Sequence, residues 1–377
     1  MSPQSARLLF AATEQSADIL YATRFFAPDP FIYLFYGGKS YVILSDLEVD
    51  RGRREAQVDE VIAYSELAAV ARANLPSQGG KMSEANVLAF YLKKQGISQV
   101  EVPANFPLSF ADILRHGRIE VRWIPDPFWP KREIKSAQEI QDLRSALRMT
   151  ERAMERAFEV LRAAKIGKGG VLHWGNHQLT SEKLRTEIET CIVSQGGLAS
   201  RTIVAGGQQA IDPHEQGSGP LCAHQLIILD IFPRHMASGY FGDMTRTVVR
   251  GHATDAQRHL WEICLEGQRR AFSQIRPRAS GKTIQNDLKT FFAQNGYPTE
   301  QRAGRWTGFF HGAGHGLGLD LHEYPRFAAT RFRANQVLTL EPGIYVPDLG
   351  GVRHEDVLLV TSTGSEFLTS LPKPLEL

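Results

Sequence analysis

Four carboxylates stand in or beside apolar, strand-like runs in the C-terminal half of this sequence. Asp230 lies within "QLIILDIF", and Asp243 opens the run in "GDMTRTVV". Glu341 follows the apolar residues of "VLTLEPGIYV", and Glu355 precedes those of "GVRHEDVLLV". Burying an ionised carboxylate costs several kcal/mol unless a cation or several hydrogen-bond donors offset it. The four acids therefore predict a site that holds positive charge.

A pair of divalent cations would account for all four acids together. Any one of them could instead lie at a strand end in solvent, or pair with Arg246 or Arg353. Four negative charges would neutralise two divalent cations, and an imidazole would add a neutral ligand. Mostly oxygen ligands with one nitrogen and no sulfur favour Mn²⁺ or Co²⁺, with Zn²⁺ and Fe²⁺ as further candidates. Such ions lower the pKa of water and polarise carbonyl groups, so the expected chemistry is hydrolysis.

The segment "FFHGAGHGLGLDLHEYP" carries three histidines, His311, His315 and His322, among glycines. The spacing of the first two resembles a zincin motif, but that motif needs a Glu after the first His and a helix to carry both imidazoles. Here Gly-Ala-Gly separates them, and each glycine weakens a helix by about 1 kcal/mol. We expect an irregular or strand-like segment whose glycines let the backbone approach a site closely.

Composition excludes several classes of protein. The 377 residues, 42% of them hydrophobic, are enough for two globular domains. A formal charge of +2, from 43 basic and 41 acidic residues, predicts no binding to nucleic acid or to a membrane surface. The apolar runs are shorter than the roughly 20 residues of a membrane span or the core of a signal peptide. Three widely spaced cysteines form no C-x-x-C motif, so we expect buried free thiols in a cytoplasmic protein.

The elements that must position the acids fall into two domains, 1–130 and 131–377. In the first domain, "FIYLFY", a Gly-Gly turn and "SYVILSD" predict a β-hairpin. Three prolines in "IPDPFWP" mark the linker. Ser136 then stands three residues before Glu139, the spacing of a capping box, and opens an amphipathic helix that we expect to end near Gly167. Helical stretches and β-type runs mix from there to the C-terminus, which favours α+β architecture.

Four motifs occur together in the order and approximate spacing of a known family: "GDMTRT", "HGAGHGLGLDLHE", "LTLEPGIY" and "GVRHEDVLLVT". With them the sequence resembles the pita-bread metallopeptidases, which include methionine aminopeptidase, aminopeptidase P, prolidase and creatinase. The resemblance covers the second domain nearly throughout, and the first domain more loosely resembles the creatinase-type N-terminal domain. It implies an α/β N-terminal domain, an α+β pita-bread catalytic domain with pseudo-two-fold symmetry, and a homodimer.

The same resemblance implies a set of metal ligands, namely Asp230, Asp243, His315, Glu341 and Glu355. Asp230 would hold one metal, and Asp243 and Glu355 would bridge both metals. His315 and Glu341 would complete the second site. All five positions carry the expected residue types, so the resemblance implies two divalent ions, with Mn²⁺ first among the candidates.

Other residues are candidates for catalysis and substrate binding. Glu341 is placed to accept the proton of the attacking water, and His322 is the candidate donor to the tetrahedral oxyanion. His322 and His311 match the family's non-ligand histidines near the scissile bond, and the alternative for each is a core histidine satisfied by its neighbours. His214, sixteen residues before Asp230, lies where the family places another substrate-facing histidine. Arg353 could bind a substrate carboxylate or only the surroundings of Glu355.

The chain departs from the family pattern between the two aspartates. Thirteen steps separate Asp230 from Asp243, which is longer than the usual spacing, and "IFPRHMASGYFG" replaces the small residue and glycine that commonly follow the first Asp. We therefore expect a longer turn, with Phe232 and Pro233 near it, and a substrate pocket of altered shape.

Within the family, two domains argue against methionine aminopeptidase, which resembles the catalytic half alone. Creatinase and the histone-chaperone relatives lack the ligand set that this chain keeps. The remaining prediction is hydrolysis of Xaa-Pro bonds, either in dipeptides or at the N-terminus of short peptides with proline second. A proline nitrogen carries no N–H and its ring fixes φ, so general peptidase clefts fit this bond poorly. The alternatives are a catalytically silent binding module and a peptidase of altered specificity.

Overall fold

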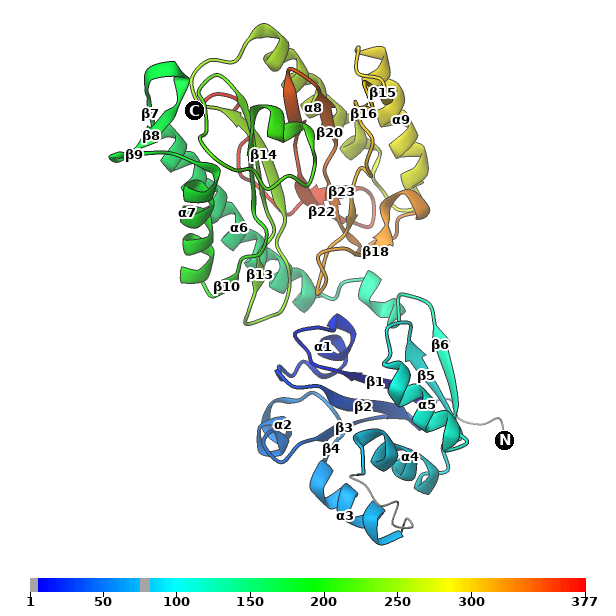
Figure 1. Cartoon of the computed structure of the whole chain (residues 1–377). Helices are drawn as coiled ribbons and strands as arrows, with labels where there is room; N and C mark the ends of the chain where they lie inside the picture. Colours follow the sequence, from blue (N-terminus) through cyan, green and yellow to red (C-terminus); the bar gives the residue numbers. More distant parts are fainter. Residues whose placement is uncertain (1–5, 75–81) are drawn as a thin grey trace. The chain divides into compact units, whose positions relative to one another are not determined.

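The computed structural model describes residues 6–74 and 82–377. The chain divides into two compact units, Met1–Pro130 and Lys131–Leu377, which Figure 1 colours from blue to cyan and from cyan to red. Each unit has hydrophobic clusters of its own.

A six-stranded sheet in the order β4-β3-β2-β1-β5-β6 forms the centre of the first unit. Its strands are β1 (Ala6–Ala11), β2 (Phe31–Tyr36), β3 (Lys39–Leu44), β4 (Glu60–Ala63), β5 (Gln99–Pro103) and β6 (Glu120–Ile124). Its helices are α1 (Ala17–Thr23), α2 (Val49–Glu55), α3 (Tyr64–Asn74), α4 (Glu84–Lys94) and α5 (Leu108–His116). Successive side chains of a strand point to opposite faces, so Leu8 packs in one hydrophobic cluster and Leu9 in another. Both faces of the sheet are therefore buried, as in an α/β domain.

The predicted hairpin is confirmed. Strands β2 and β3 pair antiparallel, with Tyr36 opposite Lys39. Gly37 and Gly38 form the turn with φ of 60° and 80°, a left-handed conformation that two-residue hairpin turns require and glycine adopts without steric cost.

Helix α6 (Ala137–Ala163) opens the second unit with the predicted capping box. The Ser136 side chain accepts from the Glu139 amide, and the Glu139 side chain accepts from the Ser136 amide. The helix ends at Ala163, earlier than the predicted end near Gly167. Residues Lys165–Ile166 form strand β7 instead, because they pair with β8 (Leu172–Trp174) and leave the helical path.

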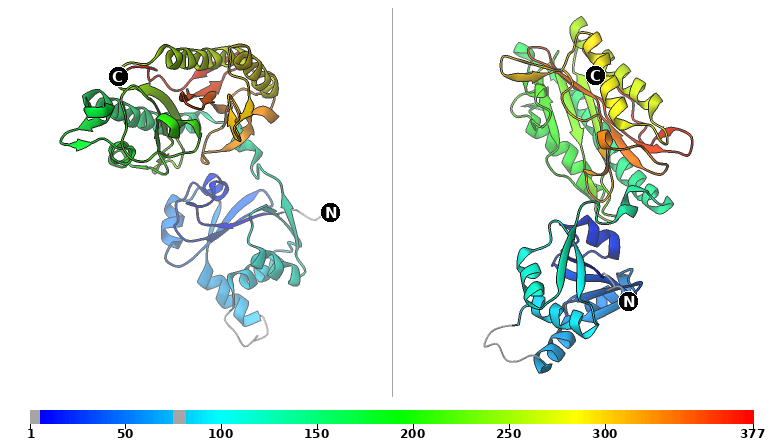
Figure 2. Two further views of the ribbon diagram at one scale, coloured as in Figure 1. Left: turned by 45° about the horizontal axis from the view of Figure 1, so that its top comes forward. Right: turned by 90° about the vertical axis from the view of Figure 1, so that its right-hand side faces the viewer.

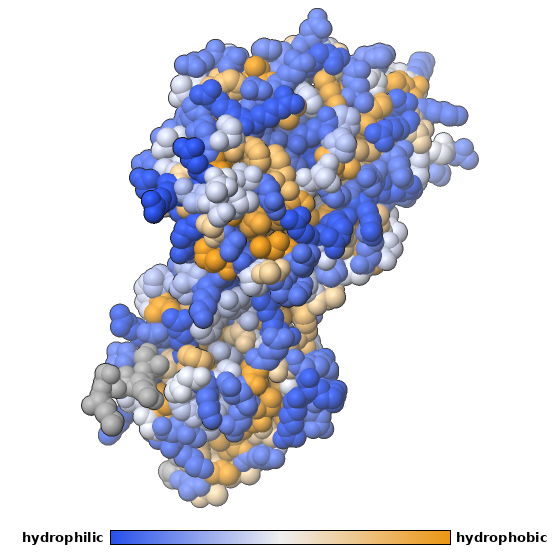
Figure 3. All heavy atoms as spheres, turned by 180° about the vertical axis from the view of Figure 1, so that it is seen from behind, coloured by the Kyte–Doolittle hydropathy of each residue, from blue (hydrophilic) through white to orange (hydrophobic). Residues whose placement is uncertain are grey.

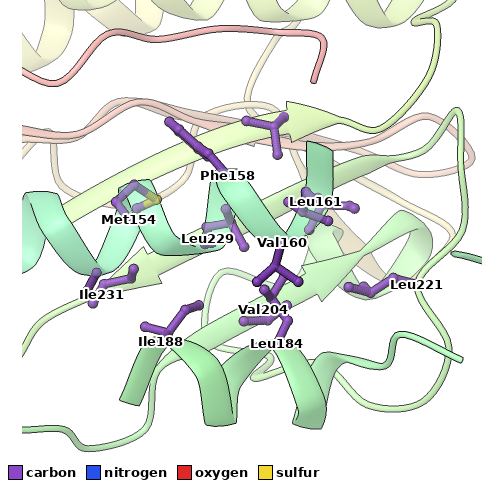
Figure 4. Close-up of a cluster of buried hydrophobic side chains, with 14 of the residues drawn as sticks. Met154, Phe158, Val160, Leu161, Leu184, Ile188, Val204, Leu221, Leu229 and Ile231 are labelled. Carbon is purple, nitrogen blue, oxygen red and sulfur yellow. The ribbon is translucent and has the colours of Figure 1, made fainter. Parts of the chain in front are cut away.

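The first half of the second unit packs two helices against a three-stranded sheet. Helix α7 (Ser181–Ser194) contacts α6, and the sheet has the order β11-β12-β14. Its strands are β11 (Ile203–Gly206), β12 (Leu226–Ile231) and β14 (Met244–Val249). Figure 4 shows the core between these layers, where Phe158 of α6 lies near Leu229 of β12 and Ile188 of α7 lies near Ile231 of β12. This packing holds β12, which carries Asp230, in a fully buried position.

The second half repeats the plan with another helix pair and sheet. Helices α8 (Asp255–Gln274) and α9 (Gly281–Gln294) lie side by side, olive to yellow in Figure 1 and Figure 2. The sheet has the order β18-β17-β19-β22-β23. Its strands are β17 (His315–Gly316), β18 (Glu323–Arg326), β19 (Val337–Leu340), β22 (Asp356–Val360) and β23 (Ser365–Phe367), and β20 (Gly343–Val346) pairs separately with β21 (Gly350–Arg353). Two such halves give the second unit its pita-bread fold.

Hydrogen bonds join the two halves along β14. The Thr247 hydroxyl donates to the Arg353 carbonyl over 3.0 Å and accepts from the Arg353 amide over 2.9 Å. The Glu355 amide donates to the Thr245 carbonyl over 3.1 Å. The segment that carries Arg353 and Glu355 is thereby held against the strand that follows Asp243.

The face drawn in Figure 3 is mainly hydrophilic, with smaller groups of hydrophobic residues. Within residues 6–74 and 82–377, no helix is both long enough and apolar enough to cross a membrane.

Candidate metal centre and active-site cavity

The first half of the second unit contributes two acids from adjacent strands. Asp230 lies in β12, opposite Ile203 of β11 on one side and Thr245 of β14 on the other. Asp243 directly precedes β14. The antiparallel pairing of β12 with β14 places both carboxylates at the same end of the sheet, where they are 9% and 4% exposed.

The second half contributes three further side chains, each at the end of a strand. His315 begins β17, and its amide donates to the Thr339 hydroxyl over 3.1 Å. Glu341 follows β19, with its amide bonded to the Ala313 carbonyl over 2.9 Å. Glu355 precedes β22, and its carboxylate accepts from the Thr245 hydroxyl over 2.7 Å. The backbone on both sides of the site is therefore held in place.

These five side chains line one cavity of about 820 Å³. The Nε2 atom of His315 lies 3.6 Å from Oδ2 of Asp243 and 3.5 Å from Oε1 of Glu341. One ligand atom each from Asp243, His315 and Glu355 lie within 4.8 Å of one another, close enough to hold one ion. The fold thus brings together all five ligand candidates from the sequence.

The electrostatics of the cavity fit bound cations. Burial and the neighbouring carboxylates raise the pKa of Asp243 and of Glu355, and burial raises the pKa of Glu341 to about 8. Burial also lowers the pKa of His315 to about 3, which leaves a neutral imidazole suited to metal binding. Oδ1 of Asp230 is buried and has no hydrogen-bond partner among the residues described. An orphaned carboxylate oxygen among crowded acids fits the donor set of a divalent cation.

Arg353 connects Asp230 to His311 through a chain of hydrogen bonds. Its Nη2 donates to Oδ2 of Asp230 and its Nη1 to the Tyr345 hydroxyl, each over 2.7 Å, while its Nε donates to Thr245 over 3.2 Å. The Tyr345 hydroxyl lies 3.0 Å from Nε2 of His311. Arg353 lines the cavity but is 3% exposed, and each guanidinium nitrogen already donates within the protein.

His311 lies at the far end of this chain. Its Nδ1 lies 2.8 Å from the Gly312 carbonyl, which can only accept, so Nδ1 carries the proton and Nε2 accepts from Tyr345. Burial and the Arg353 cation lower the pKa of His311 to about 4, in agreement with a neutral ring. His311 is therefore held rigidly at the cavity wall.

His322 and His214 lie on the open side of the cavity. Both line it and both are exposed. The rings of His322 and His315 meet edge to face, with their centroids 4.3 Å apart. Partial burial and the Arg326 cation lower the pKa of His322.

Glu323, next to His322, is buried rather than exposed to solvent. Its carboxylate accepts from Nη2 of Arg132 over 2.5 Å and from the Lys135 ammonium. Both cations come from the segment before α6, so this segment anchors the loop that carries His322. Gly318 lies against the same carboxylate, where a Cβ atom would meet Oε1 at 2.4 Å. The Tyr240 hydroxyl donates to Glu139 of α6 over 2.7 Å.

The long turn between Asp230 and Asp243 forms structure of its own. Strand β13 (Arg234–His235) pairs there with β10 (Gly197–Leu198). Phe232, at the start of the turn, lines the cavity together with Phe310 and Leu321. The turn thus extends the first half and supplies part of an apolar wall of the cavity.

Among the residues of the site that the sequence alone did not identify, two are polar groups with consequences for the chemistry. Tyr345 bonds both Arg353 and His311, and Arg201 lines the cavity. Tyr345 is the last residue of the motif "LTLEPGIY", so its place in the motif could have identified it as a site residue. Arg201 lies in no motif, and only the pairing of β11 with β12 brings it near Asp230.

The fold and the site define a peptidase of the pita-bread class. Residues 141–362 match the Metallopeptidase family M24. The match covers more than half of the chain, so the chain belongs to this family and is an enzyme, a peptidase, as the sequence predicted. Membership implies binding of divalent metal.

Relatives and solved structures agree with this assignment. The chain is 29% identical over 294 residues to an Xaa-Pro dipeptidase of Pyrococcus horikoshii, covering 76% of this chain and 77% of the relative. It is 30% identical over 262 residues to an Xaa-Pro dipeptidase of Pyrococcus furiosus, covering 68% of each. The crystal structure of an X-Pro aminopeptidase from Thermotoga maritima matches 99% of this chain and 98% of its own, with a TM-score of 0.81 at 23% identity. The last similarity confirms the expected fold across both units.

Proposed function

We propose that this enzyme hydrolyses Xaa-Pro bonds, in dipeptides or at the N-terminus of short peptides, with two divalent cations. The observation that carries the proposal is a single cavity lined by five candidate ligands, one of which, Asp230, has a buried oxygen without a partner among the described residues. The names of the two Pyrococcus relatives support the choice of bond.

The residues to hold the cations are those that the sequence suggested. Asp230 would hold one ion, and Asp243 and Glu355 would be shared between two. His315 and Glu341 would complete the second site. Carboxylate oxygens with one imidazole favour Mn²⁺, with Co²⁺, Zn²⁺ and Fe²⁺ as further candidates. When bound, the ions supply a water of low pKa and polarise the substrate carbonyl.

The chain's own residues then carry the proton and orient the substrate. Glu341 lines the cavity with its Oε1 3.5 Å from Nε2 of His315, and its carboxylate is suited to accept the proton of the attacking water. His322, exposed on the cavity side, is suited to donate to the oxyanion. His311, which is fixed by Tyr345, and His214 are suited to contact the peptide rather than the ions.

The apolar wall of the cavity suits a proline ring. This wall is formed by Phe232, Phe310 and Leu321. The proline nitrogen of the substrate has no N–H, so it needs no hydrogen-bond acceptor there. Phe232 comes from the long turn, and for this reason a peptidase of altered specificity is the second candidate. A catalytically silent binding module is disfavoured, since the chain is a peptidase of its family.

Hydrolysis assays test the proposal directly. Purified protein loaded with Mn²⁺ is expected to cleave an Xaa-Pro dipeptide or an Xaa-Pro-Yaa tripeptide, and to leave the matched Xaa-Ala peptides largely intact. If Xaa-Ala peptides are cleaved equally well, the specificity is altered. If no peptide is cleaved with Mn²⁺, Co²⁺, Zn²⁺ or Fe²⁺, the proposed activity is wrong.

We also propose a homodimer located in the cytoplasm. The pairing of β10 with β13 brings exposed Leu198 and Met236 together on the surface of the second unit, at 52% and 38% exposure. Light scattering would test the assembly, and fractionation of the source cells would test the location.

A further inference from the structure

The active-site cavity is lined by a second arginine that forms no salt bridge with the residues described. Two arginines line the cavity, Arg201 and Arg353. Arg353 is buried and bonded to Asp230, Tyr345 and Thr245. Arg201 is exposed to the cavity, and among the residues that the structure describes it has no salt-bridge partner within 4.0 Å.

The position of Arg201 is set by the same strand pairing that places Asp230. Ile203, opposite Asp230, also lines the cavity. Arg201 is two residues earlier, so its Cα lies at most about 7 Å from that of Ile203. Arg185 holds this edge, since it donates to the Thr202 carbonyl over 3.2 Å and to the Gln216 carbonyl over 2.7 Å. The Arg201 guanidinium therefore projects from a fixed edge next to the candidate metal centre.

The chemistry of a dipeptide supplies the partner that this cation lacks. In an Xaa-Pro dipeptide the terminal carboxylate follows the scissile carbonyl carbon by only three bonds, so the two groups are about 3 to 4 Å apart. A peptide held for cleavage must then place its carboxylate close to the metal centre, where the acids of the cavity would repel it. A guanidinium offers two parallel N–H donors that match a carboxylate.

We propose that Arg201 binds the C-terminal carboxylate of the substrate and makes the enzyme prefer Xaa-Pro dipeptides over longer peptides. This inference rests on the proposed peptidase function and names its substrate class. In a longer peptide the same position carries a neutral amide, which leaves Arg201 solvated but unpaired. Arg201 is thus a specificity-determining residue, and it replaces Arg353 as the candidate for the substrate carboxylate.

Three peptides separate recognition of the terminal carboxylate from recognition of the rest of the substrate: Ala-Pro, Ala-Pro amide and Ala-Pro-Ala. We expect the Mn²⁺-loaded wild type to cleave Ala-Pro with a kcat/KM about tenfold or more above that of Ala-Pro amide, because one charge-assisted pair distinguishes them. Arg201→Gln should bring this ratio toward one, mainly through KM, and Arg201→Lys should keep part of it. Arg276→Gln, a change of the same type at an exposed position outside the cavity, should behave as wild type.

The inference would be overturned if Arg201→Gln left unchanged the ratio of kcat/KM for Ala-Pro to kcat/KM for Ala-Pro amide. Mn²⁺ content and thermal unfolding of the variant should equal those of the wild type, which separates lost recognition from lost metal or fold. If the wild type cleaves none of the three peptides, the proposed function fails instead. Calorimetric binding of Ala-Pro and its amide to the wild type and to Arg201→Gln then decides the inference: equal affinities of both proteins for Ala-Pro would refute it.

Discussion

Arg353 donates to one carboxylate oxygen of Asp230 over 2.7 Å, while the other oxygen is buried without a hydrogen-bond partner among the described residues. One carboxylate thus faces a protein cation on one side and the cavity on the other. The guanidinium offsets part of the buried charge and leaves the other oxygen available to the proposed metal.

Replacing Arg353 with Met should destabilise the protein by on the order of 3 kcal/mol, because Asp230 would be left as a buried charge without its partner. Denaturant unfolding of metal-free protein measures the loss, and added Mn²⁺ should reduce it by neutralising the same carboxylate. Arg144→Met is the matched control, since Arg144 pairs with Glu366 at the surface. A loss no larger than that of the control would contradict the role of the pair.

His315→Ala should abolish both tight metal binding and turnover, because it removes the only nitrogen among the five candidate ligands. Elemental analysis after Mn²⁺ loading should find two ions in the wild type and fewer than about one in the variant. Chelation should lower the unfolding temperature of the wild type, because one metal ion at a hundred times its Kd adds about 2.7 kcal/mol to the free energy of unfolding. His177→Ala, at an exposed position outside the cavity, should change neither quantity.

His322→Ala should keep the metal and lose turnover. Removing one donor to an oxyanion costs about a hundredfold in kcat, whereas the ring of His322 is not among the candidate ligands. Steady-state kinetics and metal analysis of the same preparation check both halves of this expectation. An unchanged kcat of His322→Ala would show that His322 takes no part in the mechanism. A lower metal content of the variant would show that His322 supports the metal site instead.

Glu323→Gln should destabilise the protein in a way that depends on pH. Burial would raise the pKa of Glu323, but the Lys135 and Arg132 cations lower it below that of the unfolded chain. The carboxylate therefore contributes stability above its unfolded pKa of about 4.3, and this contribution disappears as the pH falls through the lower folded pKa. At pH 7 the variant should lose about 3 kcal/mol, since the buried cations Lys135 and Arg132 each lose a carboxylate partner, although Arg132 keeps its pair with Asp320.

Unfolding free energies of both proteins at several pH values check this expectation. The gap between wild type and Glu323→Gln should stay constant down to about pH 5 and narrow below about pH 4. Glu366→Gln, in an exposed pair, should cost less than about 1 kcal/mol at any pH. A gap that widens in acid would mean that Glu323 is not held as a carboxylate.

Local patterns in the sequence predicted much of the fold. The Gly37-Gly38 hairpin and the capping box of Ser136 and Glu139 formed as expected, because both depend on residues within a few positions of each other. The predicted end of α6 was wrong by four residues, since pairing of β7 with β8 stopped the helix. The motifs around Asp243, His315, Glu341 and Glu355 led to the correct family, because their residue types and order are specific enough without a structure.

Tertiary structure decided what each charged group contacts. The sequence placed Asp230 in an apolar strand but left its partner open, and 123 positions separate it from Arg353. The sequence left the partners of Glu323 open, and its carboxylate accepts from Arg132 and Lys135, nearly two hundred residues earlier. Arg201 entered the site only through the pairing of β11 with β12. Residue type and order determined the family and its chemistry. Which cation neutralises which acid, and which one is left for a substrate, depended on contacts between distant segments that no local pattern encodes.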